Sequence, residues 1–537
     1  MMIRKVARTR GSVRTLLGLF ALTLLASACG DDDPAQTERD GGSEAGGDEP
    51  DAGGDPDAAD ERDASDLDAD EEDADEPDAR EVDANGPDAG KQLPTATPAQ
   101  IADESADDYA DNTHGLIAGT TLATWITDWP AQRPAGVTGK LVVLQVVPNT
   151  AASLTHVAGK GTDVVSYLVP QSELTQPRNN GLSQIEAEIP DGTRADAFLE
   201  KYGIDAQRDY VVVTFEQLPA AGSTPATANS IVQQVGRAWL LLRYWGYAKE
   251  RIAILDGSVN WNGSNQGLVL SKEAAATPPN DGRVSVRELW VDNTKLVITL
   301  DDLLAVLKSE PGAPALSDVR IIDARGGAEA LGLKKATSTG KTDCPSYTNT
   351  GANTRCSPLF EGRIKGAHSV PWTQFVDTAA NGFRYLSKAQ AKKLFDTQSG
   401  YQAGQLTIQY CRTNVRSMVT GVVASVILGY PTRFYDTSFI EWSHLAYGPT
   451  EKSRLLPSDS RYRADLAHLT EHAEVTNYTP GLPYDAATQT ITRWVDGPNY
   501  NDDADISNTS PTIVSSATTA SQSVIDDRAY KLASGQP

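Results

Sequence analysis

The sequence predicts an α/β protein whose folded part contains two similar halves, each a mostly parallel sheet with helices on both faces. Two regions, residues 210–261 and 406–442, share one order of elements: an apolar strand, a loop, a helix, a Gly-Tyr turn, a short strand and a closing tryptophan. Alternation of strand and helix favours parallel sheets, because parallel neighbours need a crossover connection. Such strands are buried on both faces, and the first strand of each region is accordingly a short run rich in apolar and β-branched residues.

Each expected element has its own signal in the sequence. Lys140–Val147, Val211–Thr214 and Leu406–Gln409 are short runs rich in β-branched residues and bounded by loops. The string "DVRIIDAR" predicts another strand, which ends near Asp323. Two helices repeat apolar residues with helical spacing, and we expect the second to be amphipathic: Val235, Ala238, Trp239 and Leu242 in one, Val419, Val422, Val423 and Val426 in the other. We interpret Trp261 and Trp442 as core residues.

The first thirty residues predict export. Five basic residues precede a ten-residue apolar run at Leu16–Leu25, and the small residues 26–28 lead into Cys29. This run is too short to span a bilayer, so residues 1–28 read as a signal peptide. The pattern resembles the lipobox of bacterial lipoproteins. That resemblance implies lipidation of Cys29 and an anchor in the cell envelope, on the periplasmic face or the cell surface of the outer membrane. The alternative is an ordinary secretory peptide cut after Ala28.

Residues 29–98 predict an acidic, disordered tether. Between residues 31 and 90 there are 26 acidic and 3 basic side chains, against a net charge of −25 for the whole chain. A segment so poor in aromatic and β-branched residues cannot offset its ordering entropy, and its like charges repel. The remainder is only mildly acidic and has no basic stripe, so we expect no nucleic-acid partner.

Four motifs in the second half resemble the rhodanese family. They occur in order as "IIDAR", "GRIKGAHSVPW", "IQYCRTNVR" and "RFYDTSFIEW", and "ILDGSVNWNGSNQG" in the first half resembles the family's domain ending. The resemblance implies a tandem with an inactive domain at 99–275, a linker at 276–298 and a catalytic domain at 299–448. A polar extension at 449–537 follows, to which we assign no function. Residues 100–343 contain no cysteine, as is typical of the family's first domain.

The cysteine loop carries the predicted chemistry. Cys411 follows a strand and precedes a helix, where backbone N–H groups and the helix N-terminus favour a thiolate and bind an anion. We expect Cys411 to be the nucleophile that takes up a sulfane sulfur as a persulfide. The substrate-binding loop comprises Arg412, Thr413, Asn414, Val415, Arg416 and Ser417, and its two arginines are expected to add positive charge.

Loop length separates sulfur chemistry from phosphate chemistry. Cysteine phosphatases place a histidine before the cysteine and an arginine six residues after it, whereas this chain has Tyr410 and Ser417 at those positions.

Asn414 stands where many rhodaneses have glycine, and asparagine is the next most tolerant of left-handed backbone. By resemblance, Asp323 and Arg325 support the loop. The donor-contacting arginine of several thiosulfate-using members has no counterpart in residues 326–329, which end at Glu329.

The other cysteines and histidines have simpler interpretations. In an oxidising compartment Cys344 and Cys356 predict a disulfide across a polar loop, or alternatively a redox pair that serves Cys411. With Cys29 lipidated, Cys411 is then the free thiol. His468 and His472 fit a zinc-protease pattern, but no glutamate follows Glu474 to complete it. We therefore expect the two histidines to be neighbours on an exposed helix, and neither a metal nor a cofactor.

The function expected from the sequence is an envelope sulfurtransferase. It would move sulfur from a small anionic donor, such as thiosulfate or mercaptopyruvate, to a thiol or cyanide acceptor through a Cys411 persulfide. One alternative is a thiol-based reductase or carrier for chalcogen oxyanions such as selenite and tellurite. The other is a non-catalytic binding module with the rhodanese fold.

Overall fold

The computed structural model describes residues 93–148, 155–217, 225–333, 335–336, 342–343, 358–479, 484–501 and 511–533. Cys29, Cys344 and Cys356 lie outside the described residues, as do the signal peptide and nearly all of the acidic tether. The lipidation, the tether and the disulfide therefore stay predictions. Among the described helices, none is both long and apolar enough to cross a membrane.

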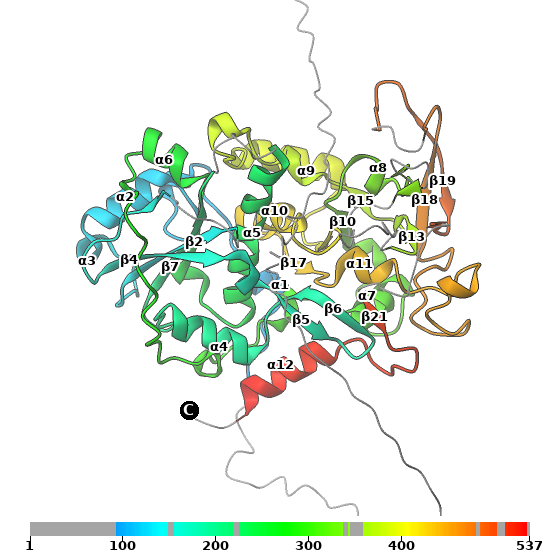
Figure 1. Cartoon of the computed structure of the whole chain (residues 1–537), viewed down its shortest axis with the longest axis horizontal. Helices are drawn as coiled ribbons and strands as arrows, with labels where there is room; N and C mark the ends of the chain where they lie inside the picture. The colour runs from blue at the N-terminus through cyan, green and yellow to red at the C-terminus, as the bar shows by residue number, and fades with distance from the viewer. Residues whose placement is uncertain are drawn as a thin grey trace, which may run out of the picture. The chain divides into compact units, whose positions relative to one another are not determined.

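The first half is a parallel sheet of five strands in the order β1-β8-β7-β2-β4; β2, β4 and β7 of this sheet are labelled in Figure 1. Its strands are β1 (Gly115–Ile117), β2 (Leu141–Val147), β4 (Val164–Pro170), β7 (Tyr210–Phe215) and β8 (Ile252–Leu255). Its helices are α2 (Gly119–Thr127), α3 (Trp129–Gln132), α4 (Gly192–Lys201), α5 (Pro225–Tyr244) and α6 (Val259–Asn265).

Side chains of this sheet alternate between two hydrophobic clusters. Val142 and Val211 pack in the cluster that holds residues of α4 and α5. Val143 and Val212 pack in the cluster that holds residues of α2, α3 and α6. Every residue of β2 and β7 is buried, so the prediction of helices on both faces is confirmed.

The second half is a parallel sheet of four strands in the order β15-β10-β16-β17. Its strands are β10 (Val319–Asp323), β15 (His368–Ser369), β16 (Leu406–Tyr410) and β17 (Thr432–Phe434). Its helices are α7 (Leu300–Leu307), α8 (Gly327–Ala330), α9 (Lys388–Ser399), α10 (Ser417–Val422) and α11 (Ser438–Trp442). Ile321 packs with residues of α7 and α11, whereas Ile322 packs with residues of α9 and α10. The fold class predicted from the sequence is confirmed in this half as well.

Helices α5 and α10 join the two halves. A Cβ added to Gly236 on α5 would lie 2.6 Å from the Cβ of Met418 on α10, so the close approach requires glycine at this position. Every residue of α10 is buried, and the helix continues as a π-helical segment over Val423–Ile427. The expected amphipathic character of this helix is therefore wrong, because the face that was expected to be exposed to solvent packs against α5.

The C-terminal extension completes both halves. It contributes β18 (Thr470–Val475), β19 (Ile491–Asp496), β20 (Asn499–Tyr500), β21 (Thr512–Ile513) and α12 (Gln522–Leu532). In the second half β18 pairs with β14 (Arg363–Ile364) and β20 with β13 (Phe360–Glu361); in the first, β21 pairs with β6 (Ser183–Glu188). Lys531 on α12 is buried and donates to the carbonyls of Trp245, Leu289 and Val291. The extension is thus part of the folded body.

The predicted helix at the two histidines is wrong. His472 lies in strand β18, and its Nδ1 is 2.9 Å from the carbonyl oxygen of Gly497. His468 lies in the turn before that strand. Pairing with β14 and β19 determines this conformation, which the spacing of the two histidines could not reveal.

Trp442 is fully buried as predicted, but Trp261 is only half-buried and stacks on Arg384.

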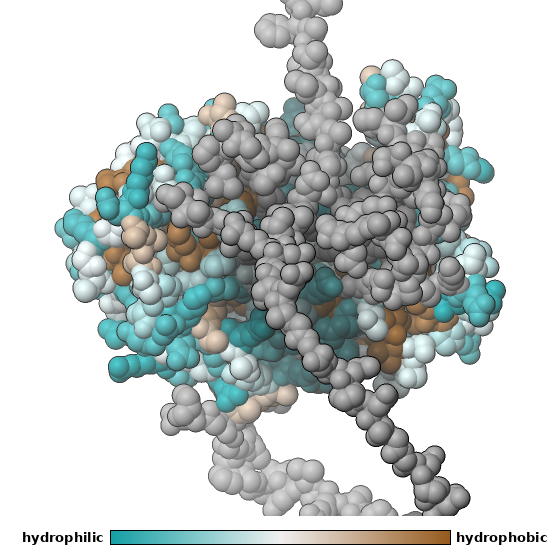
Figure 2. Space-filling model, in the orientation of Figure 1, coloured by the Kyte–Doolittle hydropathy of each residue, from teal (hydrophilic) through white to brown (hydrophobic). Residues whose placement is uncertain are grey.

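The remaining short elements are α1 (Pro98–Ile101), the antiparallel pairs β3 (His156–Val157) with β9 (Leu270–Ser271) and β5 (Gln176–Asn179) with β6, and β11 (Lys335–Ala336) with β12 (Thr342–Asp343). The face drawn in Figure 2 is largely hydrophilic, with apolar side chains in separate groups. Six large apolar residues are exposed among the described residues: Val269, Trp290, Leu316, Val514, Ile525 and Leu532.

Candidate active site

Cys411 lies directly after β16, an inner strand of the second sheet. The carboxyl ends of parallel strands are where open α/β sheets place their ligand sites. The thiol of Cys411 is free, and the residue is fully buried. Its backbone is held on both sides, since Cys411 N donates to Ser438 Oγ at 3.4 Å and Phe439 N donates to the Cys411 carbonyl at 3.1 Å. A reagent that reaches this sulfur must therefore enter a packed site.

Asn414 turns the loop through left-handed backbone. Its φ is +55°, as its position in the sequence predicts. Two side-chain hydrogen bonds hold this turn: Asn414 Nδ2 donates to Asp436 Oδ1 at 2.8 Å, and Ser417 Oγ donates to Asn414 Oδ1 at 2.7 Å. Asparagine thus supplies both the tolerated conformation and the contacts that stabilise it.

The loop backbone offers unused donors. Within the described part of the chain, the backbone N–H groups of residues 412 to 415 donate to no other residue. Two of these residues, Arg412 and Asn414, are buried. A buried N–H group without an acceptor costs roughly 1–3 kcal/mol, so such groups rarely cluster without purpose. Successive amides in a turn that contains a left-handed residue form a concavity suited to an anion.

The two loop arginines are paired with one carboxylate. Arg416 holds Glu329 through two contacts, of 2.7 and 2.8 Å, and Arg412 Nε donates to Glu329 Oε1 at 3.0 Å. Burial alone would raise the pKa of Glu329, but the guanidinium groups of Arg416 and Arg412 outweigh it and hold that pKa well below its usual range. Glu329 on α8 therefore offsets one of the two positive charges that the loop arginines add.

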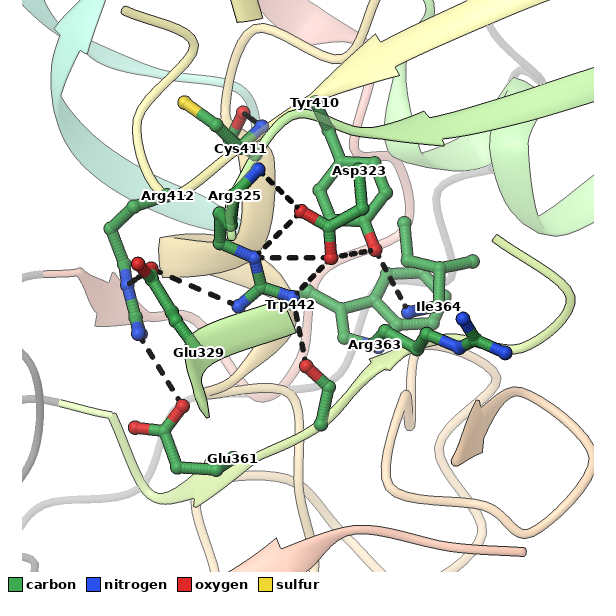
Figure 3. Close-up of polar contacts among 12 residues, drawn as sticks. Asp323, Arg325, Glu329, Glu361, Arg363, Ile364, Tyr410, Cys411, Arg412 and Trp442 are labelled. Carbon is green, nitrogen blue, oxygen red and sulfur yellow. Dashed lines mark hydrogen bonds and ion pairs between the residues drawn. The ribbon is translucent and has the colours of Figure 1, made fainter. Parts of the chain in front are cut away.

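Asp323 and Arg325 form a second buried cluster beside the loop (Figure 3). Arg325 Nε and Nη2 donate to the two carboxylate oxygens of Asp323 at 2.9 and 2.7 Å, and its guanidinium lies 4.0 Å from the ring centroid of Phe439. Tyr410, the residue before Cys411, donates from its hydroxyl to Asp323 Oδ2 at 2.9 Å. Burial, and then the Asp323 charge, raise the pKa of Tyr410 well above its usual value, so the hydroxyl keeps its proton.

Glu361 is a site residue that the sequence did not indicate. It is fully buried on β13, and its Oε2 lies 3.4 Å from Arg412 Nη2. Its Oε1, like Nη1 of Arg412 and Nη1 of Arg325, has no hydrogen-bond partner among the described residues. Burial raises the pKa of Glu361 despite Arg412 and Arg325 nearby. The sequence offered only a chemical hint. Because buried charges are paired, two arginines in a buried loop need carboxylate partners, but the sequence did not show which carboxylates these are.

The site thus contains a free thiol, a loop of available amides and two ion-paired clusters. Of the predicted site residues, the structure brings Asp323, Arg325 and the whole 411–417 loop together. Cys29, Cys344 and Cys356 fall outside the described residues. No group of three or more His, Cys, Asp or Glu side chains suited to a metal ion occurs in the described ranges.

Fold and site define a class: a chain of two parallel α/β halves with one cysteine loop at a strand end. Among solved structures, the chain is similar to the Tum1 protein from Saccharomyces cerevisiae, with 14% identity over 62% of this chain and 95% of that one and a TM-score of 0.44. It is also similar to a variant of EanB in complex with ergothioneine, with 17% identity over 60% and 67% and a TM-score of 0.43.

A third similar structure is the anaerobic ergothioneine biosynthesis enzyme from Chlorobium limicola in complex with trimethyl histidine. It shows 16% identity over 60% of this chain and 67% of that chain, with a TM-score of 0.42. No family model and no curated protein matches the sequence.

Proposed function

We propose that this protein is a sulfurtransferase of the tandem rhodanese type that carries sulfur as a persulfide on Cys411. The observation that supports it best is the loop itself, where four available backbone amides follow a free, buried thiol. Such a loop suits a singly charged sulfur, because a persulfide needs hydrogen-bond donors but no fixed cation. The order of motifs around Cys411 in the sequence supports the same chemistry.

The proposed reaction has two displacements. The Cys411 thiolate attacks the outer, sulfane sulfur of the donor; the bond between that sulfur and the donor breaks, and the leaving group keeps the electron pair. With thiosulfate the leaving group is sulfite. A nucleophilic acceptor then attacks the outer sulfur of the persulfide, and Cys411 leaves as thiolate; cyanide gives thiocyanate. Neither step needs an external oxidant or reductant.

The surrounding residues hold this loop rather than react. Asp436 and Ser417 fix Asn414, so the turn that presents the amides is formed before the donor arrives. On the other side, Tyr410 and Arg325 share the carboxylate of Asp323, which fixes the residue that precedes the thiol. We assign a positioning role to both groups.

Intact-mass analysis tests the proposal. The full-length protein is treated with thiosulfate, mercaptopyruvate or a low-molecular-weight persulfide and then weighed, before and after cyanide. We expect a gain of one sulfur atom that cyanide removes as thiocyanate, and no gain in Cys411→Ser. An adduct that persists in the serine variant would contradict the proposal. A selenium or tellurium adduct would instead favour the oxyanion carrier, and no adduct with any donor would favour a binding module.

The proposed location is the cell envelope, through lipid on Cys29. The basic residues, short apolar run and small residues before Cys29 support it. Radiolabelled palmitate should enter the wild-type protein in a bacterial host with a lipoprotein pathway, and should not enter Cys29→Ser. Label retained in that variant would contradict the proposed anchor.

A further inference from the structure

Glu329 is placed against the cysteine loop by its own short helix. It lies on α8, a few residues beyond the end of β10, and its side chain is almost fully buried. Its two carboxylate oxygens accept from Nη1 and Nη2 of Arg416, and Oε1 also accepts from Nε of Arg412. A third arginine, Arg325, has its Nη1 4.0 Å from the same oxygen. One carboxylate therefore faces three guanidinium groups.

This arrangement matches the way an arginine binds an anionic ligand. Two parallel N–H···O contacts to one carboxylate are the geometry by which a guanidinium recognises a carboxylate, sulfonate or phosphate. In this chain the anion is part of the protein. Because Glu329 is tethered beside Arg416, its effective concentration exceeds that of a dissolved anion, which must displace it to reach the same nitrogens.

Arg412 is directed away from the reacting sulfur as well. In Figure 3 its guanidinium extends toward Glu329 and Glu361, on the opposite side from the sulfur of Cys411. The loop arginines are thus paired with internal carboxylates. Apart from Nη1 of Arg412, which is buried and has no hydrogen-bond partner among the described residues, the donors left to a substrate at the loop are the backbone amides of residues 412 to 415. Those amides suit one sulfur atom with a single charge; they supply no cation for a second anionic group.

We propose that Glu329 is a built-in counter-anion that makes the Cys411 site selective for sulfane-sulfur donors without a second anionic group. The inference rests on the proposed function and adds its donor class: small alkyl persulfides in place of thiosulfate or mercaptopyruvate. The Cys411 thiolate attacks the outer sulfur of R–S–SH, the donor S–S bond breaks, and R–S⁻ leaves with the electron pair. The proton stays with the transferred sulfur until the Cys411 persulfide ionises.

The test compares two donors on the full-length protein. The rates at which Cys411 gains one sulfur from thiosulfate and from cysteamine persulfide, whose amine leaves it without net negative charge, are measured by quenched intact mass. We expect the wild type to prefer cysteamine persulfide. Glu329→Gln should raise thiosulfate loading relative to persulfide loading by about tenfold, because Arg416 and Arg412 become available to the sulfonate end.

Glu474→Gln is the matched control. Glu474 also accepts two hydrogen bonds from one arginine, from Nε and Nη2 of Arg493 at 2.8 and 2.7 Å, but both side chains are exposed and belong to the β18–β19 hairpin. This variant should leave both rates unchanged. An unchanged donor ratio in Glu329→Gln, or equal use of both donors by the wild type, would overturn the inference.

A measurement on the wild type alone covers the case in which Glu329→Gln fails to fold. Sulfate, an unreactive divalent anion, is added at constant ionic strength during loading by cysteamine persulfide. Because the arginines are already occupied, we expect the rate to fall by less than about twofold; strong inhibition at low sulfate would overturn the inference. If neither donor loads Cys411 in any variant, the proposed function itself fails, which is a different outcome from loading without selectivity.

Discussion

Asn414 on the cysteine loop and Arg237 on α5 of the first half bond to the same atom, Oδ1 of Asp436. Asn414 Nδ2 is 2.8 Å from it, and Arg237 Nη1 pairs with it; the other oxygen, Oδ2, accepts from Ile189 N at 2.7 Å. Arg237 and Asp436 are both buried. The half that lacks a cysteine therefore helps to set the conformation of the loop that has one.

Substitution of Arg237, a residue of the first half, should slow sulfur transfer at Cys411 in the second half. Arg237→Met leaves the Asp436 charge buried with one partner fewer, a change that destabilises proteins by about 3 kcal/mol or more. We expect a lower midpoint of urea unfolding and a loading rate of Cys411 reduced about tenfold, since the Asn414 turn loses its fixed acceptor. Both are measured on the full-length protein, the second by intact mass.

Arg243→Met is the control for that variant. Arg243 is a second buried arginine of α5, but it donates to the backbone carbonyls of Ile101 and Tyr247, and within the described part of the chain it makes no hydrogen bond or ion pair with the loop. It should lower stability while the loading rate of the folded protein stays near wild type. Equal loss of loading in both variants would show that Arg237 acts through general stability alone.

Substitutions at Asn414 separate its backbone role from its side-chain role. Asn414→Gly accepts the left-handed φ but loses the bonds to Asp436 and Ser417, whereas Asn414→Ala loses the bonds and adds backbone strain of about 1–2 kcal/mol. The free energy of unfolding should therefore rank wild type above glycine above alanine, by urea titration. Alanine as stable as glycine would contradict the left-handed turn.

Tyr410→Phe tests the link between Asp323 and the thiol. It removes the hydroxyl that donates to Asp323 Oδ2 and accepts from Ile364 N at 3.3 Å, while the ring stays. Leaving Ile364 N without that acceptor should cost about 1–2 kcal/mol in unfolding free energy. The loading rate should fall only severalfold, because Arg325 still holds Asp323. Complete loss of loading would mean that the hydroxyl takes part in the chemistry.

The sequence predicted what depends on local pattern. β2, β7 and β16 are short strands rich in apolar and β-branched residues, and the left-handed Asn414 was expected because asparagine stands where many rhodaneses have glycine. The pairing of Glu329 with Arg416 could not be predicted, because the two residues are 87 positions apart and meet only when α8 packs against the loop. Likewise, α10 is buried on every side only because α5 of the other half covers it. Both features depend on contacts that are set by tertiary structure.

Glu188 should give stability a measurable dependence on pH. It lies on β6, and burial together with the nearby Asp436 charge raises its pKa from 4.5 to about 8. The folded state therefore binds a proton that the unfolded state releases between these two values. In that window the unfolded chain binds fewer protons, so the contribution of Glu188 to the free energy of unfolding falls as pH rises from about 5 to about 8.

Glu188→Gln removes this titration while keeping the shape of the side chain. We expect the variant to gain stability relative to the wild type as pH rises from about 5 to about 8, because glutamine stays neutral beside Asp436. Urea titrations of both proteins at the two pH values give the difference directly. If the difference in free energy of unfolding between the two proteins stays constant with pH, or if a more stable variant loses its advantage toward pH 8, Glu188 is ionised in the folded state. Its charge would then be balanced by Arg178, the cation that lowers its pKa.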